Sequence, residues 1–193
     1  MIKHVNSIYN RVSVRDFLEK DISEEMVYNI IKAGTFAPSS GNMQPWEFVI
    51  VRDRQQKCQL IRTTFSGFYS KNAKNQFWLL NAPIIIVICV NYKRTASRYG
   101  VLSQKWAPID TANAVQNMIL TATENNLRTC WVGGILENEA AKLLNLPNYV
   151  MPIGLLPLGY AKEERSQQKY KMNPSWITHK EKYNIPYFKD NIE

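Results

Sequence analysis

The stretch APSSGNMQPW, from Ala37 to Trp46, decides how this sequence folds. A helical pattern with Ser23 at its start precedes this stretch, and a β-rich segment, 46–51, follows its first nine residues. Pro38 disfavours helical geometry at the residue before it, so we expect the helix to end near Phe36 and a loop to follow. The backbone exposed in a loop of small residues can approach a flat ligand closely.

A second pattern lies upstream, where Arg11, Ser13 and Arg15 alternate with valines. A guanidinium fork matches the oxygen geometry of a phosphate, and a serine hydroxyl adds a neutral donor. Alone, such a cluster is most often a solvated helix face, and a Pro-Ser-Ser-Gly loop is most often a turn. Both patterns in this order favour an anion-binding site.

Strands and helices alternate along the rest of the chain. We expect a strand buried on both faces at 84–90, because this run of β-branched residues is bounded by Pro83 and Asn91. Further strands are expected at 46–51, 129–132 and 153–158, and helices at 24–36, 52–64, 66–81, from Pro108 to the Asn125-Asn126 pair, and 137–144. This order predicts an α/β or α+β sheet flanked by helices.

Length and composition indicate one globular domain over residues 1–193, of which 45% are hydrophobic. The longest apolar run, 84–90, is too short to cross a bilayer, and the N-terminus lacks the apolar core of a signal peptide. Cys58, Cys89 and Cys130 show no CxxC spacing, so neither disulfides nor a zinc site are expected. We expect a cytoplasmic protein.

The net charge of +8 permits binding to nucleic acid or to an anionic surface. No nucleic-acid-binding motif is present, however, and the basic residues are scattered, so we expect neither a nucleic-acid nor a membrane partner. His4 and His179 have no ligand-like neighbours, and the sequence contains no HExxH motif. A metal site is therefore not expected.

Three segments together resemble the nitroreductase-like family of FMN-dependent oxidoreductases: RVSVRDF (11–17), APSSGNMQPWEFVIV (37–51) and TCWVGGI (129–135). The resemblance extends from about Ile8 to His179. It implies an α+β fold with a mixed central β-sheet flanked by helices, assembled as a dimeric α-β sandwich. It also implies a homodimer with FMN at the subunit interface, and a C-terminal arm, about 165–193, that embraces the partner subunit.

The resemblance assigns the FMN phosphate to Arg11 and Ser13, together with Lys169 and Lys171. Lys171 stands where relatives more usually have arginine, and a lysine loses the bidentate geometry. Arg15 matches the basic position that reaches the pyrimidine edge of the flavin, where a cation stabilises the charge gained on reduction. From spacing alone, the lysine pair could equally lie on a solvated strand.

The same resemblance assigns the flavin ring to residues from three other places. Asn75 matches an amide that binds the ring or the ribityl chain, and the backbone N–H groups of Gly133 and Gly134 face flavin N5, where glycine permits close approach. Pro38, Ser39, Ser40 and Asn42 come from the other subunit. The alternatives are an exposed helical asparagine for Asn75 and an ordinary turn for the glycine pair.

Aromatic residues are candidates for the substrate side of the flavin. The resemblance places Phe65, Phe68, Tyr69, Tyr99 and Trp106 in variable stretches that line that side, and the segment 66–105 holds the expected substrate lid. Large aromatic residues in strands and helices are more often core residues than stacking platforms for a ligand. Both interpretations are open for four tryptophans: Trp46, Trp78, Trp106 and Trp131.

The implied activity is a ping-pong reaction, in which NAD(P)H reduces FMN and the reduced flavin then reduces a nitroaromatic, a quinone or a similar acceptor. No side chain needs to act as nucleophile or base, because the flavin carries the chemistry. Since no GxGxxG follows a strand, NAD(P)H and the acceptor would use one pocket in turn. The alternatives are a specialised flavoenzyme of the same fold, either a reductive dehalogenase or a flavin-fragmenting enzyme, and a non-catalytic flavin-binding protein.

Overall fold

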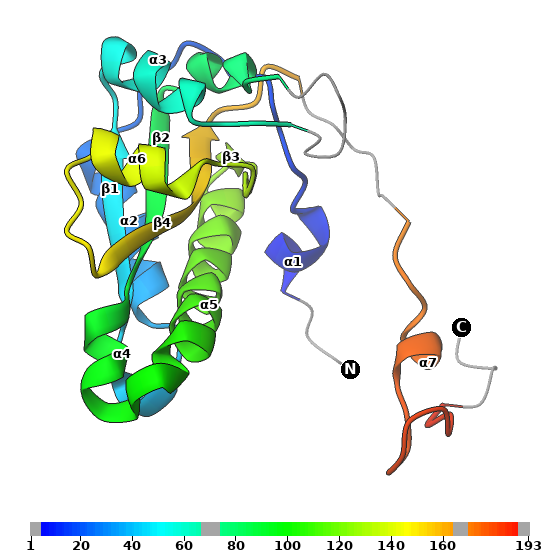
Figure 1. The fold of residues 1–193 in the computed structure, drawn as a ribbon. Coiled ribbons are helices and arrows are strands. Elements are labelled where there is room, and N and C mark those ends of the chain that lie inside the picture. Colours follow the sequence, from blue (N-terminus) through cyan, green and yellow to red (C-terminus); the bar gives the residue numbers. More distant parts are fainter. Residues whose placement is uncertain (1–4, 67–73, 164–169, 189–193) are drawn as a thin grey trace.

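The protein is built around a four-stranded antiparallel sheet (Figure 1). The structure is a computed structural model that describes residues 5–66, 74–163 and 170–188. The strand order is β1-β2-β4-β3, and each neighbouring pair is antiparallel. The strands are β1 (Trp46–Val51), β2 (Ile84–Asn91), β3 (Arg128–Thr129) and β4 (Val150–Gly159).

Strand β2 is the centre of the core, because all of its residues are buried. Ile84, Ile86 and Ile88 contribute to the hydrophobic cluster on one face of the sheet, and Ile85 and Val87 to the cluster on the other. This alternation follows from the two-residue period of a strand. The prediction of a strand buried on both faces is therefore confirmed.

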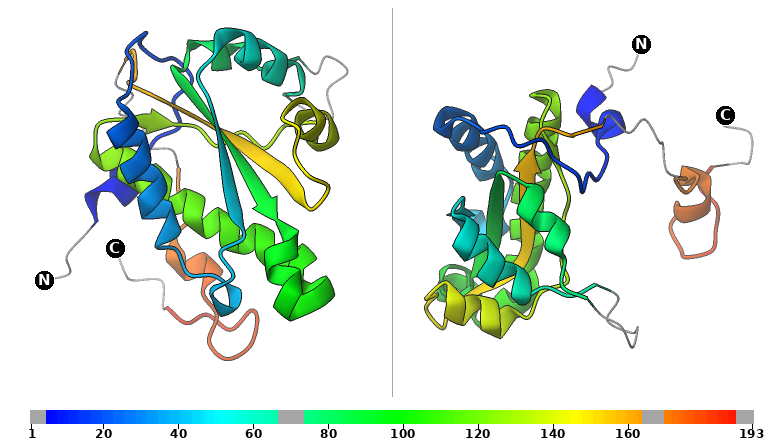
Figure 2. Two further views of the ribbon diagram at one scale, coloured as in Figure 1. Left: turned by 90° about the vertical axis from the view of Figure 1, so that its left-hand side faces the viewer. Right: turned by 90° about the horizontal axis from the view of Figure 1, so that it is seen from above.

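Helices cover both faces of the sheet (Figures 1 and 2). Helices α2 (Glu24–Thr35) and α5 (Ser103–Glu124) contribute to one cluster, whereas α3 (Arg54–Arg62), the 3-10 helix η2 (Phe77–Asn81) and α6 (Glu137–Leu143) contribute to the other. The remaining helical elements are α1 (Asn6–Asn10), η1 (Ser40–Asn42), α4 (Tyr92–Tyr99), η3 (Gly100–Leu102) and α7 (Pro174–Ile177). The α+β class and the sandwich arrangement are confirmed.

The N-terminal segment contacts the edge of this antiparallel sheet through one isolated parallel bridge. Ser13 forms a parallel bridge with Thr129, and the N–H of Val14 donates to the Thr129 carbonyl at 3.0 Å. The predicted strand 129–132 is present as two short pieces: β3, and a separate bridge between Val132 and Leu155. Cys130 and Trp131 lie between these pieces and face the site described below.

Two of the predicted helices are wrong in part. Helix α5 begins at Ser103 and contains Pro108 in its interior, whereas the sequence placed Pro108 at the start. The predicted helix over 66–81 is not formed in its described part, where Ser66 pairs with Lys74 and only 77–81 is helical, as a 3-10 turn. The Thr64 hydroxyl accepts the Gln76 N–H at 2.9 Å and so holds this segment in a non-helical path.

The described tail, 170–188, stands apart from the sheet and its helices in all the ribbon views (Figures 1 and 2). It contains α7, and a bridge between His179 and Pro186 folds it back on itself. Among the described residues, no helix combines the length and the apolar character needed to cross a membrane.

Candidate functional site

The N-terminal segment and α5 enclose a cavity of about 410 Å³, here called the Arg11 cavity. The parallel bridge to Thr129 places Arg11 and Ser13 at its wall. Helix α5 contributes side chains from successive turns, and the strand after it contributes the remainder. The complete lining is Arg11, Ser13, Ala112, Gln116, Ile119, Thr129, Cys130 and Trp131.

The Arg11 cavity carries a positive charge that no carboxylate among the described residues neutralises. The ion pairs formed among the described residues are Arg52 with Asp21 and Arg94 with Glu47, so Arg11 has no carboxylate partner there. Trp131 is a large apolar side chain that remains 38% exposed at the cavity wall. A cation and a hydroxyl beside an aromatic wall suit a ligand that has both an anionic and a planar part.

Arg15 is exposed and does not line this cavity. Its guanidinium lies over the ring of Trp78, 5.9 Å from the centroid, which is within the range of a cation–π contact. Trp78 itself is half-buried and packs against two hydrophobic clusters, as the core reading of the tryptophans predicts. Trp46, buried beside Ala37 and Ala114, follows the same reading.

The predicted glycine pair and Asn75 meet around one loop. The Gly134 carbonyl accepts the Phe65 N–H at 2.9 Å, and the Asn75 amide donates to the Thr64 carbonyl at 2.7 Å. A Cβ on Gly134 would lie 2.3 Å from the Phe65 carbonyl oxygen, so close approach requires glycine there. Neither Gly133 nor Gly134 has a positive φ. Asn75 is not helical, which removes the reading of it as an exposed helical residue.

The loop Pro38–Asn42 has an unusual backbone. Gly41 and Asn42 have φ values of 53° and 60°, and Gln44 follows with 48°. Such left-handed conformations cost free energy in residues other than glycine, least in asparagine. The Ser39 hydroxyl accepts the Gln44 N–H at 3.0 Å and stabilises the turn.

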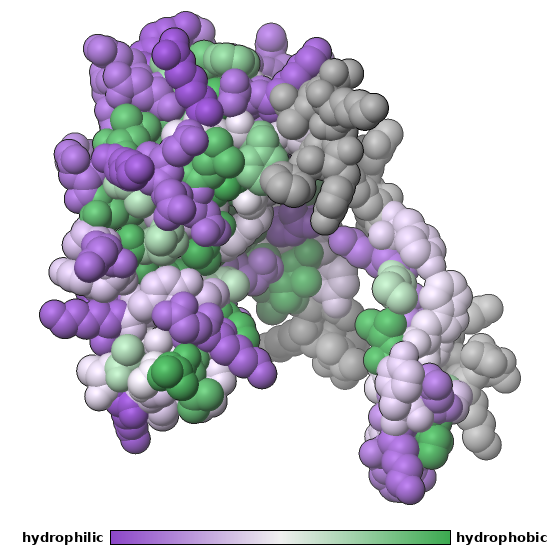
Figure 3. Space-filling model, in the orientation of Figure 1, coloured by the Kyte–Doolittle hydropathy of each residue, from purple (hydrophilic) through white to green (hydrophobic). Residues whose placement is uncertain are grey.

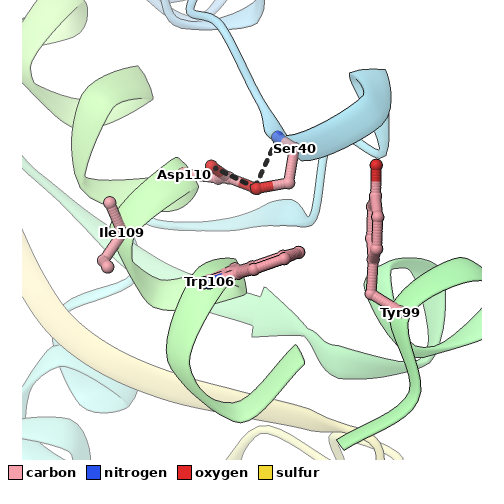
Figure 4. Close-up of a pocket in the computed structure, with 5 residues that line it drawn as sticks. All are labelled: Ser40, Tyr99, Trp106, Ile109 and Asp110. Carbon is pink, nitrogen blue, oxygen red and sulfur yellow. Dashed lines mark hydrogen bonds between the residues drawn. The ribbon is translucent and has the colours of Figure 1, made fainter. Parts of the chain in front are cut away.

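Hydrogen bonds between Ser40 and Asp110 connect this loop to α5 (Figure 4). One carboxylate oxygen accepts the Ser40 N–H at 2.9 Å, and the other accepts the Ser40 hydroxyl at 3.3 Å. Asp110 is 6% exposed. Because Asp110 and Ser40 are 70 positions apart, no local sequence pattern indicates their contact.

Ser40 and Asp110 line a second cavity of about 330 Å³, here called the Tyr99 cavity, with Tyr99, Trp106 and Ile109 (Figure 4). The Tyr99 and Trp106 rings meet edge to face, with centroids 5.0 Å apart and an interplanar angle of 70°. This geometry suits aromatic side chains in contact. Two of the predicted substrate-side aromatics therefore lie beside the predicted loop.

The predicted site residues thus form separate groups within one chain. Arg11 and Ser13 share one cavity, Asn75 lies beside Gly134, and Ser40 lies in the other cavity. Lys171 is exposed in the tail, while Lys169, Phe68 and Tyr69 lie outside the described residues. Sequence reasoning missed Gln116, which lies one turn after Ala112 on α5, because it is one of many polar residues along this helix.

Comparison with known proteins gives concordant matches. The model of the family described as "Nitroreductase family" matches residues 8–160. A protein of Archaeoglobus fulgidus with the provisional name NADH dehydrogenase/NAD(P)H nitroreductase is 31% identical over 182 residues, which cover 91% of this chain and 96% of that protein. The FMN reductase [NAD(P)H] of Bacillus subtilis is 25% identical over 193 residues, covering 93% of this chain and 74% of that protein.

The fold comparison agrees. The solved structure of NfrA2 from B. megaterium matches with a TM-score of 0.82 at 26% identity, covering 93% of this chain and 74% of that one. Fold and sequence together define an oxidoreductase. The chain belongs to the nitroreductase family.

Proposed function

We propose that this protein is an FMN-dependent oxidoreductase in which NAD(P)H and then a nitroaromatic, quinone or similar electrophile react in turn at the bound flavin. The Arg11 cavity carries this proposal, because it combines an unneutralised cation and a hydroxyl with an aromatic wall. FMN, when bound, supplies a redox centre that takes up two electrons as hydride and passes them to the acceptor.

The residues of the Arg11 cavity fit this cofactor. Arg11 and Ser13 would hold the phosphate through charge-assisted and neutral hydrogen bonds. A cavity of about 410 Å³ has the size of typical small-molecule sites. Lys169 and Lys171 stay predictions for the same phosphate, the former outside the described residues and the latter exposed in the tail.

The ring would extend from this cavity toward Gly133, Asn75 and Arg15. The N–H groups of Gly133 and Gly134 donate to no other group in the described part of the chain, so both can donate to a ligand. A Cβ on Gly133 would have its nearest neighbour at 3.6 Å, which leaves its backbone accessible. Arg15 would place a fixed positive charge near the pyrimidine end, where it favours reduction.

The position of the loop supports a homodimer. Within one chain, Ser40 contacts Asp110 near the start of α5, whereas Gln116 and Ile119, farther along the helix, line the Arg11 cavity. We infer that Pro38, Ser39, Ser40 and Asn42 complete the site of the other subunit. Large hydrophobic side chains near the N-terminus and in the tail are exposed and could contact a partner: Val5, Ile8, Tyr170, Met172, Trp176, Ile177 and Tyr183.

No side chain acts as nucleophile or base in this proposal. The Tyr99 cavity, with Tyr99 and Trp106, would contribute to the side on which NAD(P)H and the acceptor bind in turn. A cytoplasmic location stays a prediction, which cell fractionation tests.

The purified protein tests the proposal directly. We expect a flavin absorption spectrum, release of FMN on denaturation, an apparent mass of two chains in solution, and oxidation of NADH or NADPH with nitro or quinone acceptors. A protein that neither contains flavin nor gains it from added FMN would contradict the proposal. Bound FMN without turnover of either acceptor would favour a specialised dehalogenase or flavin-fragmenting enzyme.

A further inference from the structure

We propose that Asp110 is a positioning residue that holds Ser40 and its loop in the shape needed to complete the flavin site of the partner subunit. This inference rests on the proposed function, because it assigns the loop to the neighbouring site. Asp110 contacts no cofactor in this arrangement and acts through Ser40.

The first observation is how the carboxylate is satisfied. Asp110 is 6% exposed, and neither ion pair of the described chain includes it. Burying a carboxylate is costly unless hydrogen bonds compensate. Both hydrogen bonds that it accepts come from Ser40, one from the N–H and one from the hydroxyl. The buried carboxylate is therefore directed to one residue of the loop.

The second observation is the backbone beside Ser40. Gly41, Asn42 and Gln44 all have positive φ, and at the two residues other than glycine this conformation is costly and needs support from the surroundings. Other contacts hold the far end of the loop, where Arg94 donates to the Gln44 carbonyl at 2.8 Å. At the near end, Asp110 of α5 accepts two hydrogen bonds from Ser40, and Ala114 of the same helix packs against Ala37.

The third observation is the shared helix. Asp110 and Gln116 both belong to α5, so the helix that holds the loop also lines the Arg11 cavity. The position of the loop is thus set relative to the cavity of its own subunit. In a two-fold dimer, a loop fixed in this way presents Ser40 and Asn42 to the partner without further ordering, which lowers the entropic cost of binding.

The experiment compares Asp110→Ala and Asp110→Asn with the wild-type homodimer. We expect Asp110→Ala to raise the Kd for FMN about tenfold, since it removes two hydrogen bonds to a charged group. Asp110→Asn retains one acceptor oxygen and should restore most of the affinity. The absorption band of bound FMN should also shift in Asp110→Ala, a signal that a change in fold stability alone does not move.

Hydrogen exchange of the Ser40 amide in flavin-free protein gives an independent readout. The amide should exchange at least about tenfold faster in Asp110→Ala than in wild type. Asp21→Ala is the matched control, because it removes an exposed carboxylate from a surface ion pair with Arg52. We expect wild-type FMN affinity and Ser40 exchange in this control.

Two outcomes overturn the inference and differ from each other. Wild-type FMN affinity and spectrum in Asp110→Ala, with faster Ser40 exchange, would show that the contact is structural only. If wild-type protein itself binds no FMN, the proposed function fails and the flavin role of the contact fails with it. The exchange measurement would then still show separately whether Asp110 holds Ser40.

Discussion

Helix α5 lines both the Arg11 cavity and the Tyr99 cavity, but the two cavities differ in whether their charged side chains have partners in the described chain. In the Arg11 cavity, no carboxylate of the described chain neutralises Arg11. In the Tyr99 cavity, the Asp110 carboxylate is satisfied by Ser40 (Figure 4). The first region has donors available to an external anion, whereas the second uses its polar groups to fix its own shape.

The tail differs from the rest of the molecule in its position. On the face drawn in Figure 3, apolar and polar side chains are interspersed in both regions, but the tail stands apart from the sheet and its helices. Trp176 and Tyr183 in the tail are 60% and 80% exposed. A tail of this composition fits contact with a partner better than it fits contact with water.

The largest expected effect concerns the sheet that supports both cavities. Burial raises the pKa of Cys89 in β2 from 9.0 to about 12. A group with a raised folded-state pKa binds its proton more tightly when folded, so its stabilising contribution is complete below pH 9 and is lost as the pH rises toward 12. The full loss corresponds to about 4 kcal/mol in the free energy of unfolding.

Urea unfolding between pH 8 and pH 11 checks this expectation. The free energy of unfolding should fall with pH in wild type and fall less steeply in Cys89→Ala, and only the two slopes are compared. Equal slopes would contradict the buried-thiol explanation. Both cavities should lose ligand binding together as the sheet unfolds.

The next effect separates the two cavities. We expect Arg11→Ala combined with Ser13→Ala to raise the Kd for FMN roughly hundredfold, because it removes the charge-assisted bonds to the phosphate. A titration followed by flavin fluorescence measures it. Arg54→Ala, which removes an exposed charge from α3, is the control and should bind FMN like wild type. Unchanged FMN affinity in the double variant would contradict the assignment of the FMN phosphate to the Arg11 cavity.

The smallest effect tests the loop. Gly41→Ala places a side chain at φ 53°, with its Cβ 2.4 Å from the Tyr99 hydroxyl, whereas Gly100→Ala has a similar φ of 51° and nothing within 4 Å. Both should lose at least about 1 kcal/mol of stability, measured by thermal unfolding, because a side chain at positive φ is strained. Only Gly41→Ala should also change the KM for the acceptor. The same KM change in Gly100→Ala would argue against a role for the Tyr99 contact.

The sequence predicted much of the fold because its strongest patterns are local. Strand β1 matches the expected 46–51 range, and β2 extends the expected 84–90 strand by one residue. Where tertiary contacts decide, prediction failed. Pro108 lies inside α5, which begins at Ser103. In the described part of 66–81, Thr64 accepts the Gln76 N–H, and only 77–81 is helical.

The candidate site was predicted unevenly for the same reason. Arg11 and Ser13 lie together in one cavity, as their spacing and the family resemblance indicated. The roles assigned to them and to the other site residues stay predictions. Asp110 was missed, since its contact with Ser40 joins residues far apart in the sequence. A sequence pattern within one chain also does not show which residues of two subunits would meet in the proposed dimer.

Helix α5 also fixes the distance between Asp110 and Gln116. Asp110 and Gln116 are six positions apart, a rise of about 9 Å along the axis. Inserting one residue between them would rotate Gln116 by about 100° relative to Asp110. Gln116 could then no longer face the Arg11 cavity while Asp110 faced Ser40. In the proposed dimer, one helix therefore sets the distance between a subunit's own cavity and the loop that it contributes to the other subunit.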